Sequence, residues 1–394
     1  MTPAAQVFSA SQILQEILNG KRANSSLQQW SKRNRYAGSN DRRAIRDFVY
    51  DSLRIKRSAL SKIMAPHSGR NWAVGVLLEA NEDLEKYFND ETYASPRLTE
   101  EEKFAIQKAK EYTNPPDVEF NVPAFLWPIW TADLGSEAVT IAKTLCHRAP
   151  AFLRVNIRKT TIEKAQKILS GDGIQTVQHP SVITALRVTD GQNKIKNCAA
   201  YKNGLVEIQD ASSQASVIDV PRDNKLKILD YCCGSGGKSL ALDAWTNGKI
   251  FAHDVCSDRT FDLKTRAKRS NANITKISKP IKERFDVIFC DVPCSGSGSW
   301  RRDPDGKWKL TANSWQNLLN TQIQILNEAK ELLTPDGILV YATCSVLSTE
   351  NYKQLETFCD AYPEFEIKKA RQFFPSDLGD GFFYGFLKKS KKFS

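Results

Sequence analysis

The sequence lacks the residue clusters and runs that mark several large classes of protein. Its nine cysteines contain no Cys-x-x-Cys pair, and its four histidines, His67, His147, His179 and His253, are scattered over 394 residues. Zinc sites and disulfide frameworks depend on regular spacing, so we expect reduced thiols, no bound metal and no histidine acting as a general base. No apolar run approaches the ~20 residues that cross a bilayer, and the N-terminus resembles no signal peptide. We therefore expect a cytoplasmic monomer without a membrane partner.

Charge is present in excess and is unevenly distributed. The net charge is +11, and residues 1–70 carry 13 Lys and Arg against 4 Asp and Glu. Residues 71–150 carry 7 against 14. Such blocks favour a basic surface that docks on a polyanion, with nucleic acid as the expected partner. A solvated basic helix face would give the same counts, and charge alone does not separate the two interpretations.

The order of periodic segments predicts three domains. Residues 1–115 have helical spacing, for example over 41–64, and a capping box at Thr99–Glu102. Residues 116–212 read as a small α+β module. From residue 213 to 394 strands and helices alternate, which predicts an α/β fold with a doubly wound parallel sheet whose ligand lies beyond the carboxyl ends of the strands.

A glycine-rich turn follows the first strand of this last domain. The segment Asp230-Tyr-Cys-Cys-Gly-Ser-Gly-Gly-Lys238 leads from a strand into a helix, so its backbone can approach a ligand at the helix N-terminus. About twenty residues later the second strand ends at Asp254, whose carboxylate can accept hydrogen bonds from ribose hydroxyls. The glycine-rich turn and Asp254 together fit the binding of either a dinucleotide or S-adenosylmethionine.

Two cysteines lie at strand ends of the same sheet. Cys294 occurs in Asp291-Val-Pro-Cys-Ser-Gly, and Cys344 occurs in Tyr341-Ala-Thr-Cys-Ser. A thiol at such a position can have a pKa low enough for nucleophilic attack, and a thiol pair suits chemistry on a pyrimidine ring. From the residues alone the two roles cannot be ranked. Cys290, inside an apolar strand, is interpreted as core.

The loop after Cys294 mixes cations and aromatic rings. It contains Trp300-Arg-Arg302 and Lys307-Trp308. Such a mixture could grip phosphate and stack on an extruded base.

These motifs resemble the RNA cytosine-5 methyltransferases of the RsmB/Nop/Sun family, most closely the RsmB branch of 16S rRNA methyltransferases. The glycine-rich turn is similar to the family's S-adenosylmethionine motif, and the two cysteine segments are similar to its Asp-x-Pro-Cys and Thr-Cys-Ser motifs. Gln209-Asp-Ala-Ser212 and Gly381-Phe-Phe-Tyr384 also match family elements. The resemblance implies a Rossmann-like class I methyltransferase domain, a preceding α+β RNA-binding module, and an all-α NusB-like RNA-binding domain at the N-terminus.

The resemblance also implies a role for each site residue. Cys344 would be the nucleophile that attacks carbon 6 of cytosine, and Cys294 would promote product release. Asp291 would hydrogen-bond the cytosine ring nitrogen, with Lys238 close to the reacting base. The cofactor, S-adenosylmethionine, would be held by residues of the turn and the two strand ends: Cys232, Cys233, Gly234, Ser235, Gly236, Gly237, Lys238, Asp254 and Asp291.

The sequence departs from the family pattern at two places, and other functions stay open. Gly234-Ser235 replaces the usual Ala-Pro, and residues 274–284 offer only Glu283 as the acidic ligand expected near adenine. The expected substrate is small-subunit ribosomal RNA. A tRNA cytosine is the enzymatic alternative, and a non-catalytic RNA-binding ribosome-assembly factor is the alternative from another class. DNA cytosine methylation and nicotinamide-dependent oxidoreduction fit the residues less well.

Overall fold

The computed structural model describes residues 1–390 and divides into two compact units. The helical unit consists of Met1–Arg148 and Trp300–Leu310, and the α/β unit consists of Ala149–Ser299 and the chain from Thr311 onward. Among the described residues, no helix has the length and apolar character needed to cross a membrane.

The helical unit is built from amphipathic helices around one core. Its α-helices are α1 Pro3–Leu18, α2 Ala23–Arg33, α3 Ser39–Arg54, α4 Lys56–Ser61, α5 Gly69–Glu79, α6 Glu100–Ala109, α7 Pro116–Glu119, α8 Trp127–Leu134, α9 Ala138–Leu145 and α15 Pro304–Lys309. The predicted capping box opens α6, with the Glu102 N–H donating to Thr99 Oγ1 at 3.2 Å. Gly75 allows α5 to cross α4 closely, because a Cβ there would lie 1.8 Å from the Ala59 carbonyl oxygen.

Residues 116–148, which follow the expected boundary at residue 115, pack with the helical unit. Pro115 is the N-cap of α7 and Pro116 is its first residue, where proline suits the first helical turn. The Asn121 side chain accepts hydrogen bonds from the Arg57 and Ser58 N–H groups, at 2.9 and 3.1 Å, and so ties this segment to α4.

The α/β unit begins with a small antiparallel sheet of order β2-β3-β1-β4. Its strands are β1 Ala151–Val155, β2 Gln175–Gln178, β3 Ala185–Asp190 and β4 Val206–Ile208, accompanied by α10 Ile162–Gly171, α11 Ala199–Lys202 and α12 Ala211–Ile218. These elements confirm the expected α+β module.

A seven-stranded sheet of order β10-β11-β9-β8-β5-β6-β7 forms the rest of the unit. Its strands are β5 Lys227–Asp230, β6 Lys249–Ala252, β7 Ile274–Lys276, β8 Phe285–Asp291, β9 Leu333–Thr343, β10 Phe365–Phe373 and β11 Phe382–Lys389. The neighbours from β7 to β9 are parallel, whereas β11 is antiparallel to both β9 and β10. The sheet is therefore mixed, not wholly parallel. The edge strand β10 was not predicted, because its Lys, Glu and Arg residues obscure the alternation of apolar and polar residues that indicates a strand.

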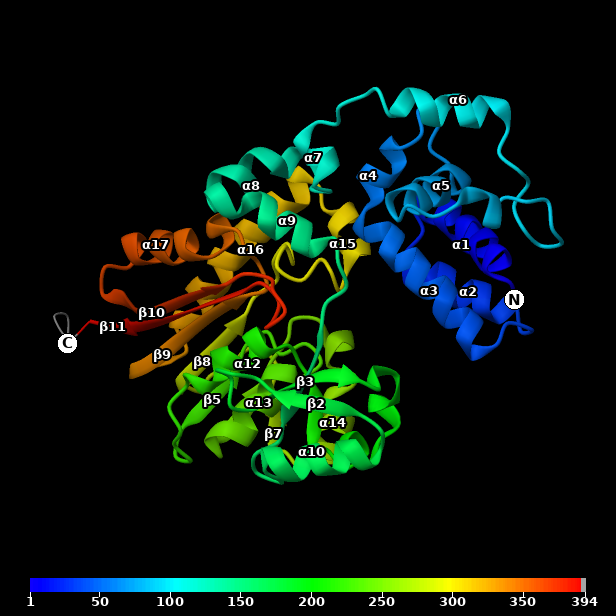
Figure 1. Ribbon diagram of the computed structural model, residues 1–394. Helices are drawn as coiled ribbons and strands as arrows, with labels where there is room; N and C mark the ends of the chain where they lie inside the picture. Colours follow the sequence, from blue (N-terminus) through cyan, green and yellow to red (C-terminus); the bar gives the residue numbers. More distant parts are fainter. Residues whose placement is uncertain (391–394) are drawn as a thin grey trace. The chain divides into compact units, whose positions relative to one another are not determined.

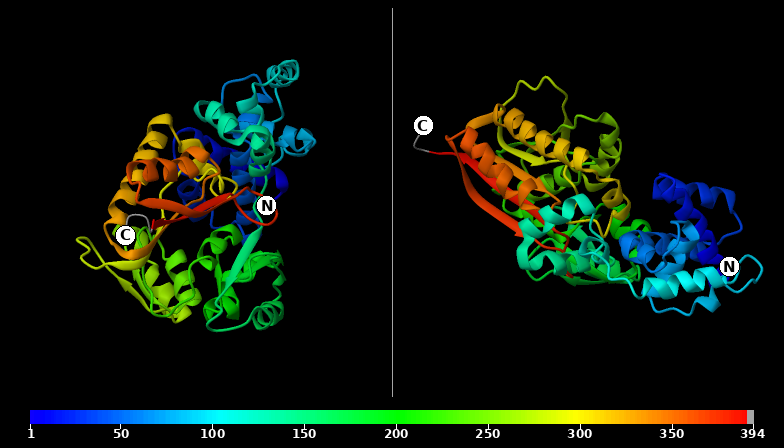
Figure 2. Two further views of the ribbon diagram at one scale, coloured as in Figure 1. Left: turned by 90° about the vertical axis from the view of Figure 1, so that its left-hand side faces the viewer. Right: turned by 90° about the horizontal axis from the view of Figure 1, so that it is seen from above.

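Helices cover both faces of this sheet, as a doubly wound fold requires (Figure 1). They are α13 Gly237–Thr246, α14 Leu263–Ser270, α16 Ala312–Lys330 and α17 Tyr352–Ala361. Alternate residues of β8 serve the two cores: Val287 and Phe289 lie in one, Ile288 and Cys290 in the other. Figure 2 shows α16 and α17 in the α/β unit from two further directions. The α/β class is confirmed, and Cys290 is core as expected.

Candidate active site at the carboxyl ends of the strands

The glycine-rich turn between β5 and α13 is closed by backbone hydrogen bonds. The Cys233 N–H donates to the His253 carbonyl, and the Gly236 N–H donates to the Cys233 carbonyl, at 2.9 and 2.8 Å. Gly236 has φ +84°, and a Cβ there would lie 2.2 Å from Leu263 Cδ1. Glycine is therefore required at Gly236 by both conformation and space.

Gly234 leaves open space where a side chain would otherwise project. It has φ +48°, and a Cβ there would meet no atom within 4 Å. The neighbouring Ser235 is exposed, and its carbonyl and hydroxyl oxygens both accept hydrogen bonds from Arg266 at 2.7 Å. Arg266 on α14 thus fixes the turn, a contact that the sequence did not suggest.

The two adjacent cysteines shape the turn by packing. Cys233 is buried against Ala252 and Leu263, and Cys232 is partly buried against the core beneath the sheet. Burial raises the pKa of Cys233 to about 12 and raises that of Cys232 further, so both remain neutral thiols. This agrees with a role in packing.

Asp254 lies just beyond β6 and faces the turn. Its Oδ2 accepts from the Gly234 N–H and its Oδ1 from the Cys256 N–H, both at 2.9 Å. The carboxylate is partly exposed, and each oxygen keeps acceptor capacity for a further donor. Val255 beside it is 89% exposed, an apolar surface at the same strand end that the sequence analysis did not single out. Glu283 is exposed in the stretch that follows β7.

Lys238, in the first turn of α13, forms a buried ion pair. Its side chain is 5% exposed, and Nζ lies 3.0 Å from Asp291 Oδ2 and 2.7 Å from Ser213 Oγ. Asp230 lies beneath this pair, and burial raises its pKa to about 7. Its Oδ2 accepts from Ser239 Oγ at 2.6 Å, while its buried Oδ1 has no hydrogen-bond partner among residues 1–390. Ser213 and Asp230 are site residues that the sequence analysis did not assign.

The two cysteines singled out from the sequence lie side by side. Cys294 follows β8, Cys344 follows β9, and their sulfur atoms are 3.4 Å apart. Both are partly buried free thiols. The backbone joins the two loops, since the Gly298 N–H donates to the Cys344 carbonyl at 2.9 Å.

The environments of the two sulfur atoms differ. The hydrogen bond between the two sulfur atoms holds the pKa of Cys344 below its ordinary value, with Ser299 adding to the effect. The same hydrogen bond, together with burial and the charge of Cys344, raises the pKa of Cys294 well above its ordinary value. Of the two thiols, Cys344 is therefore the one that ionises more readily, which is what a nucleophile at this position needs.

Glu350 joins the two cysteine-bearing loops from beneath. Its fully buried carboxylate accepts from the Ser295 N–H at 2.7 Å and from Ser345 Oγ at 2.6 Å. It also accepts from the Ser295 hydroxyl and, at 3.2 Å, from Gln322 Nε2. Ser295 and Ser345 each directly follow one of the two cysteines. In the sequence, Glu350-Asn351 follows the Thr-Cys-Ser motif as in the family pattern, but that resemblance assigned no role to the glutamate.

The cation-rich segment after Cys294 does not form the base-stacking loop that its sequence suggested. Trp300 is buried against Trp130, with ring centroids 5.6 Å apart. Lys307 is 1% exposed, and its Nζ donates to the Arg54 and Asn121 carbonyls at 3.1 and 3.0 Å. Arg301 is also buried, whereas Arg302 is exposed. The segment packs into the helical unit because burial there removes the apolar surface of its aromatic rings and of the lysine methylene groups from water.

Comparison with known families matches most of the α/β unit. Residues 217–388 match the model of the 16S rRNA methyltransferase RsmB/F, and residues 122–193 match the ferredoxin-like domain of RsmF/B-like methyltransferases.

Relatives and solved structures agree with these matches. The chain is 32% identical over 295 residues to ribosomal RNA small subunit methyltransferase B of Pasteurella multocida, covering 67% of this chain and 65% of that protein. It is 31% identical over 261 residues to the protein of the same name from Klebsiella pneumoniae, covering 62% and 60%. The crystal structure of PH0851 shares the fold with a TM-score of 0.77 at 20% identity, over 99% of each chain. The alignments thus span less than two thirds of these two relatives.

Proposed function

Because the chain belongs to the RsmB/F family of methyltransferases, we propose that it methylates carbon 5 of a cytosine in RNA through a covalent bond to Cys344. Small-subunit ribosomal RNA is the favoured substrate, since the relatives are named for it. The observation that carries the proposal is the pair of sulfur atoms 3.4 Å apart, in surroundings that lower the pKa of Cys344 and raise that of Cys294.

S-adenosylmethionine, the cofactor of this family, supplies an electrophilic methyl group. The residues of the turn fit it: Gly234 leaves the backbone open to a close ligand, and Asp254 keeps acceptor capacity for ribose hydroxyls. The exposed Val255 would cover the adenine in place of the acidic ligand missing after β7. The other residues of the turn would contribute to cofactor binding by fixing the shape of its backbone: Cys232, Cys233, Ser235, Gly236 and Gly237.

The reaction begins with addition of the Cys344 thiolate to carbon 6. The new carbon–sulfur bond breaks the carbon 5–carbon 6 double bond, and the displaced electrons reach the ring nitrogen, which takes up a proton from water. Asp291, held by Lys238, would keep that proton in a hydrogen bond. Carbon 5 is now nucleophilic and would accept the methyl group, whose former bonding electrons stay with the sulfur that carried it. The ring nitrogen returns its proton to water and regains its double bond to carbon 4.

Release requires loss of the carbon 5 proton. Once Cys344 is a thioether, the thiolate that held the hydrogen bond to Cys294 is gone and so is its negative charge, so two of the causes that raise the pKa of Cys294 are removed. Cys294 can then release its proton to water, accept the carbon 5 proton and become a thiol again. The carbon 5–carbon 6 double bond reforms, Cys344 leaves as a thiolate, and the hydrogen bond from Cys294 stabilises it as before.

The test combines methyl transfer to small-subunit ribosomal RNA, bisulfite mapping of the product and a search for covalent complexes. Wild type should modify a cytosine. The Cys344→Ser variant should neither methylate RNA nor form an adduct. Cys294→Ser should accumulate a protein–RNA complex that survives denaturing electrophoresis, because attack proceeds and elimination stalls.

Cys359→Ser, which removes another partly buried thiol, is the matched control and should behave as wild type. A trapped complex with Cys344→Ser instead of Cys294→Ser would reverse the two roles. Absence of any methylated cytosine with wild type would refute the proposed function.

A further inference from the structure

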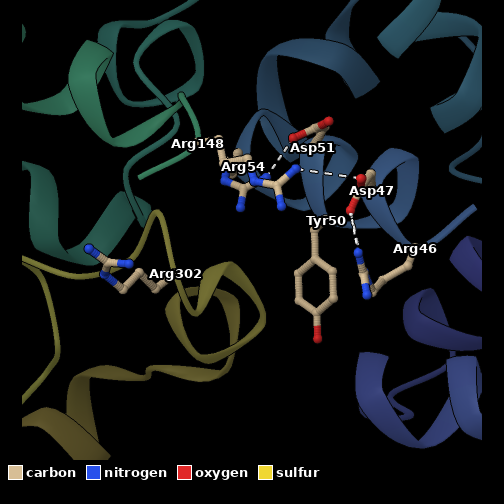
Figure 3. Close-up of a pocket in the computed structure, with 7 residues that line it drawn as sticks. All are labelled: Arg46, Asp47, Tyr50, Asp51, Arg54, Arg148 and Arg302. Carbon is tan, nitrogen blue, oxygen red and sulfur yellow. Dashed lines mark hydrogen bonds and ion pairs between the residues drawn. The ribbon is translucent and has the colours of Figure 1, made fainter. Parts of the chain in front are cut away.

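Two buried arginines, one in each unit, donate hydrogen bonds to different kinds of acceptor. Arg54 of the helical unit donates from Nη1 to Asp51 Oδ1 at 2.5 Å, within the cluster of side chains drawn in Figure 3. Arg154, on β1 of the α/β unit, donates from Nη1 to Gln209 Oε1 and, at 2.9 Å, to the Gly237 carbonyl. A carboxylate can only accept, whereas an amide also has an NH2 group that donates. The chain of hydrogen bonds that begins at Arg154 therefore continues beyond its first acceptor.

The orientation of the Gln209 amide is fixed by the donors of Arg154. A guanidinium has five donors and no acceptor, so only the amide oxygen can face it. The amide nitrogen of Gln209 then faces the other way and donates to Ser213 Oγ at 3.3 Å. The backbone is held as well, because the Gln209 N–H donates to the Phe152 carbonyl and its carbonyl accepts from Gln214 Nε2. Ser213 is therefore an acceptor toward Gln209, not a donor.

Ser213, in the first turn of α12, accepts a second hydrogen bond. Lys238 Nζ lies 2.7 Å from its Oγ, and an ammonium group, like a guanidinium, can only donate. A hydroxyl has two acceptor lone pairs and one proton. Because Gln209 and Lys238 occupy both lone pairs, the hydroxyl proton points away from both of them. Ser213 is only partly buried, so a ligand can reach this proton.

The Ser213 hydroxyl lies next to the carboxylate of Asp291. Lys238 Nζ contacts both groups, since Asp291 Oδ2 is 3.0 Å from it. Asp291 is one third exposed. A single ammonium group thus holds a hydroxyl donor beside a carboxylate acceptor. Such a pair matches a planar ring that presents an acceptor and a donor on adjacent atoms.

We propose that Ser213 is a further catalytic residue, whose hydroxyl donates a hydrogen bond to the carbonyl oxygen on carbon 2 of the target cytosine. Arg154 and Gln209 are positioning residues, because they leave the hydroxyl proton no direction except toward the substrate. The proposal rests on the proposed methylation of cytosine. Carbon 2 is bonded to the ring nitrogen that Asp291 would hold, so the two protein groups would meet neighbouring positions of one base.

The addition step explains what this donor contributes. When the Cys344 thiolate attacks carbon 6, the displaced electrons reach the ring nitrogen, and the carbonyl oxygen on carbon 2 shares their negative charge. A donor that already points at this oxygen stabilises the developing charge more than it stabilises the neutral base. The hydroxyl keeps its proton throughout, so the balance of the reaction is unchanged.

The first measurement is kcat for methyl transfer to small-subunit ribosomal RNA, with RNA and S-adenosylmethionine both saturating. Ser213→Ala should lower kcat about 10- to 100-fold, the usual cost of one hydrogen bond to a charged group, and should leave the S-adenosylmethionine affinity measured by calorimetry unchanged. Ser213→Thr, which keeps a hydroxyl, should recover part of the loss. Ser216→Ala is the matched control: it removes a buried hydroxyl one turn later on α12 that donates to the Ser213 carbonyl at 2.8 Å, and it should keep the wild-type kcat.

Gln209→Glu tests the direction of the hydrogen-bond chain. The carboxylate has nearly the same size and still accepts from Arg154, but it cannot donate to Ser213. The serine proton should turn toward this new acceptor, so kcat should fall as far as in Ser213→Ala while the cofactor affinity stays that of wild type. Because both changes remove the same donor, the double variant should be no slower than either single variant. A wild-type kcat for Gln209→Glu would overturn the positioning role.

A modified substrate tests which atom of the base the hydroxyl contacts. Once bisulfite mapping has located the modified cytosine, 2-thiocytidine is placed at that position, because sulfur is a weak acceptor. The wild-type rate should fall on this RNA, and Ser213→Ala should cause little further loss. An undiminished effect of Ser213→Ala on the thio substrate would overturn the assignment of the carbonyl oxygen.

Two further outcomes would also overturn the inference while wild type still methylates cytosine. One is an equal kcat for Ser213→Ala and Ser216→Ala. The other is a loss of S-adenosylmethionine affinity in Ser213→Ala that accounts for its whole defect, since the hydroxyl would then serve the cofactor. If wild type methylates no cytosine, the proposed function is refuted and this inference is refuted with it.

Discussion

Two buried lysines, one in each unit, have opposite surroundings. Lys238 of the α/β unit lies against a carboxylate and a hydroxyl, and the ring of Phe382 is 4.5 Å from its Nζ. Lys307 of the helical unit lies against two carbonyl oxygens and the ring of Trp308, at 4.4 Å. Burial lowers the pKa of Lys307 to about 8.

The partners of the two lysines differ in whether they reach solvent, where a substrate could contact them. Asp291 is one third exposed, so the ion pair of Lys238 opens onto a surface where a base can lie. The carbonyl partners of Lys307 are enclosed and join three chain segments. A buried lysine therefore indicates chemistry when its partner is a charged group that reaches solvent, and structure when its partners are enclosed backbone groups.

The largest expected effect is on the rate of methyl transfer, which should fall when Lys238 is replaced but not when Lys307 is replaced. Lys238→Met should lower methyl transfer about 100- to 1000-fold, the usual loss when one preorganised charge is removed from a reaction site. Lys307→Met should retain the turnover per folded molecule but lose about 1–3 kcal/mol of unfolding free energy, because two buried carbonyls lose their donor.

Initial rates and chemical denaturation of both variants measure these quantities. A Lys307→Met protein that is stable but inactive would contradict the structural role of Lys307. An active Lys238→Met protein would contradict the role of Lys238 in the reaction.

The sequence predicted the α/β unit better than the segment that contains Lys307. Strand ends follow from periodicity, and parallel strand ends meet at one sheet edge. Cys294 and Cys344 could thus be placed together from the sequence alone. Their order of action could not, because it depends on a hydrogen bond between two side chains 50 residues apart.

The segment from Trp300 to Lys309 shows why composition misleads. Aromatic rings beside cations suit a nucleic-acid surface and a buried lysine equally well. The two possibilities are distinguished by the carbonyl groups that accept hydrogen bonds from Lys307, and these lie 253 and 186 residues away in the chain. Ser213 and Glu350 were missed for the same reason, since their contacts cross between separate elements.

The next effect concerns Glu350, the buried acid of the α/β unit. Glu350→Gln leaves one carboxamide oxygen for four donors, so we expect a loss of about 2–3 kcal/mol in unfolding free energy and slower adduct formation. Cys294 is the main cause of the low pKa of Cys344, while the charge of Glu350 raises it. Alkylation of Cys344 should therefore shift to lower pH in the variant even as methyl transfer falls.

The exposed Glu356 of α17 provides the control variant Glu356→Gln, which should change neither quantity. An unchanged pH profile for Glu350→Gln would mean that the carboxylate does not position the two thiols.

A smaller effect is expected at the cofactor turn. Asp254→Ala removes one or two charge-assisted hydrogen bonds to the ribose, each of about 1.5–3 kcal/mol. It also frees the N–H groups of Gly234 and Cys256, so the turn loosens. Calorimetry of S-adenosylmethionine binding measures the loss, with Asp258→Ala, an exposed acid four residues later, as the control. Equal affinities for wild type and Asp254→Ala would remove Asp254 from the site.

The smallest effect is a pH dependence that belongs to Lys307 alone. Its pKa is about 8 in the folded chain against an ordinary value of 10.5, so the unfolded chain binds more protons between these values. Stability from this group therefore rises with pH across that window, by at most about 1.4 kcal/mol per pH unit. Subtracting the unfolding free energy of Lys307→Met cancels the other titrating groups, and the difference should grow from pH 7.5 to pH 9.5. A difference that stays flat or shrinks would show that enclosed carbonyls hold this ammonium as well as a carboxylate would, and the distinction between the two lysines would fail.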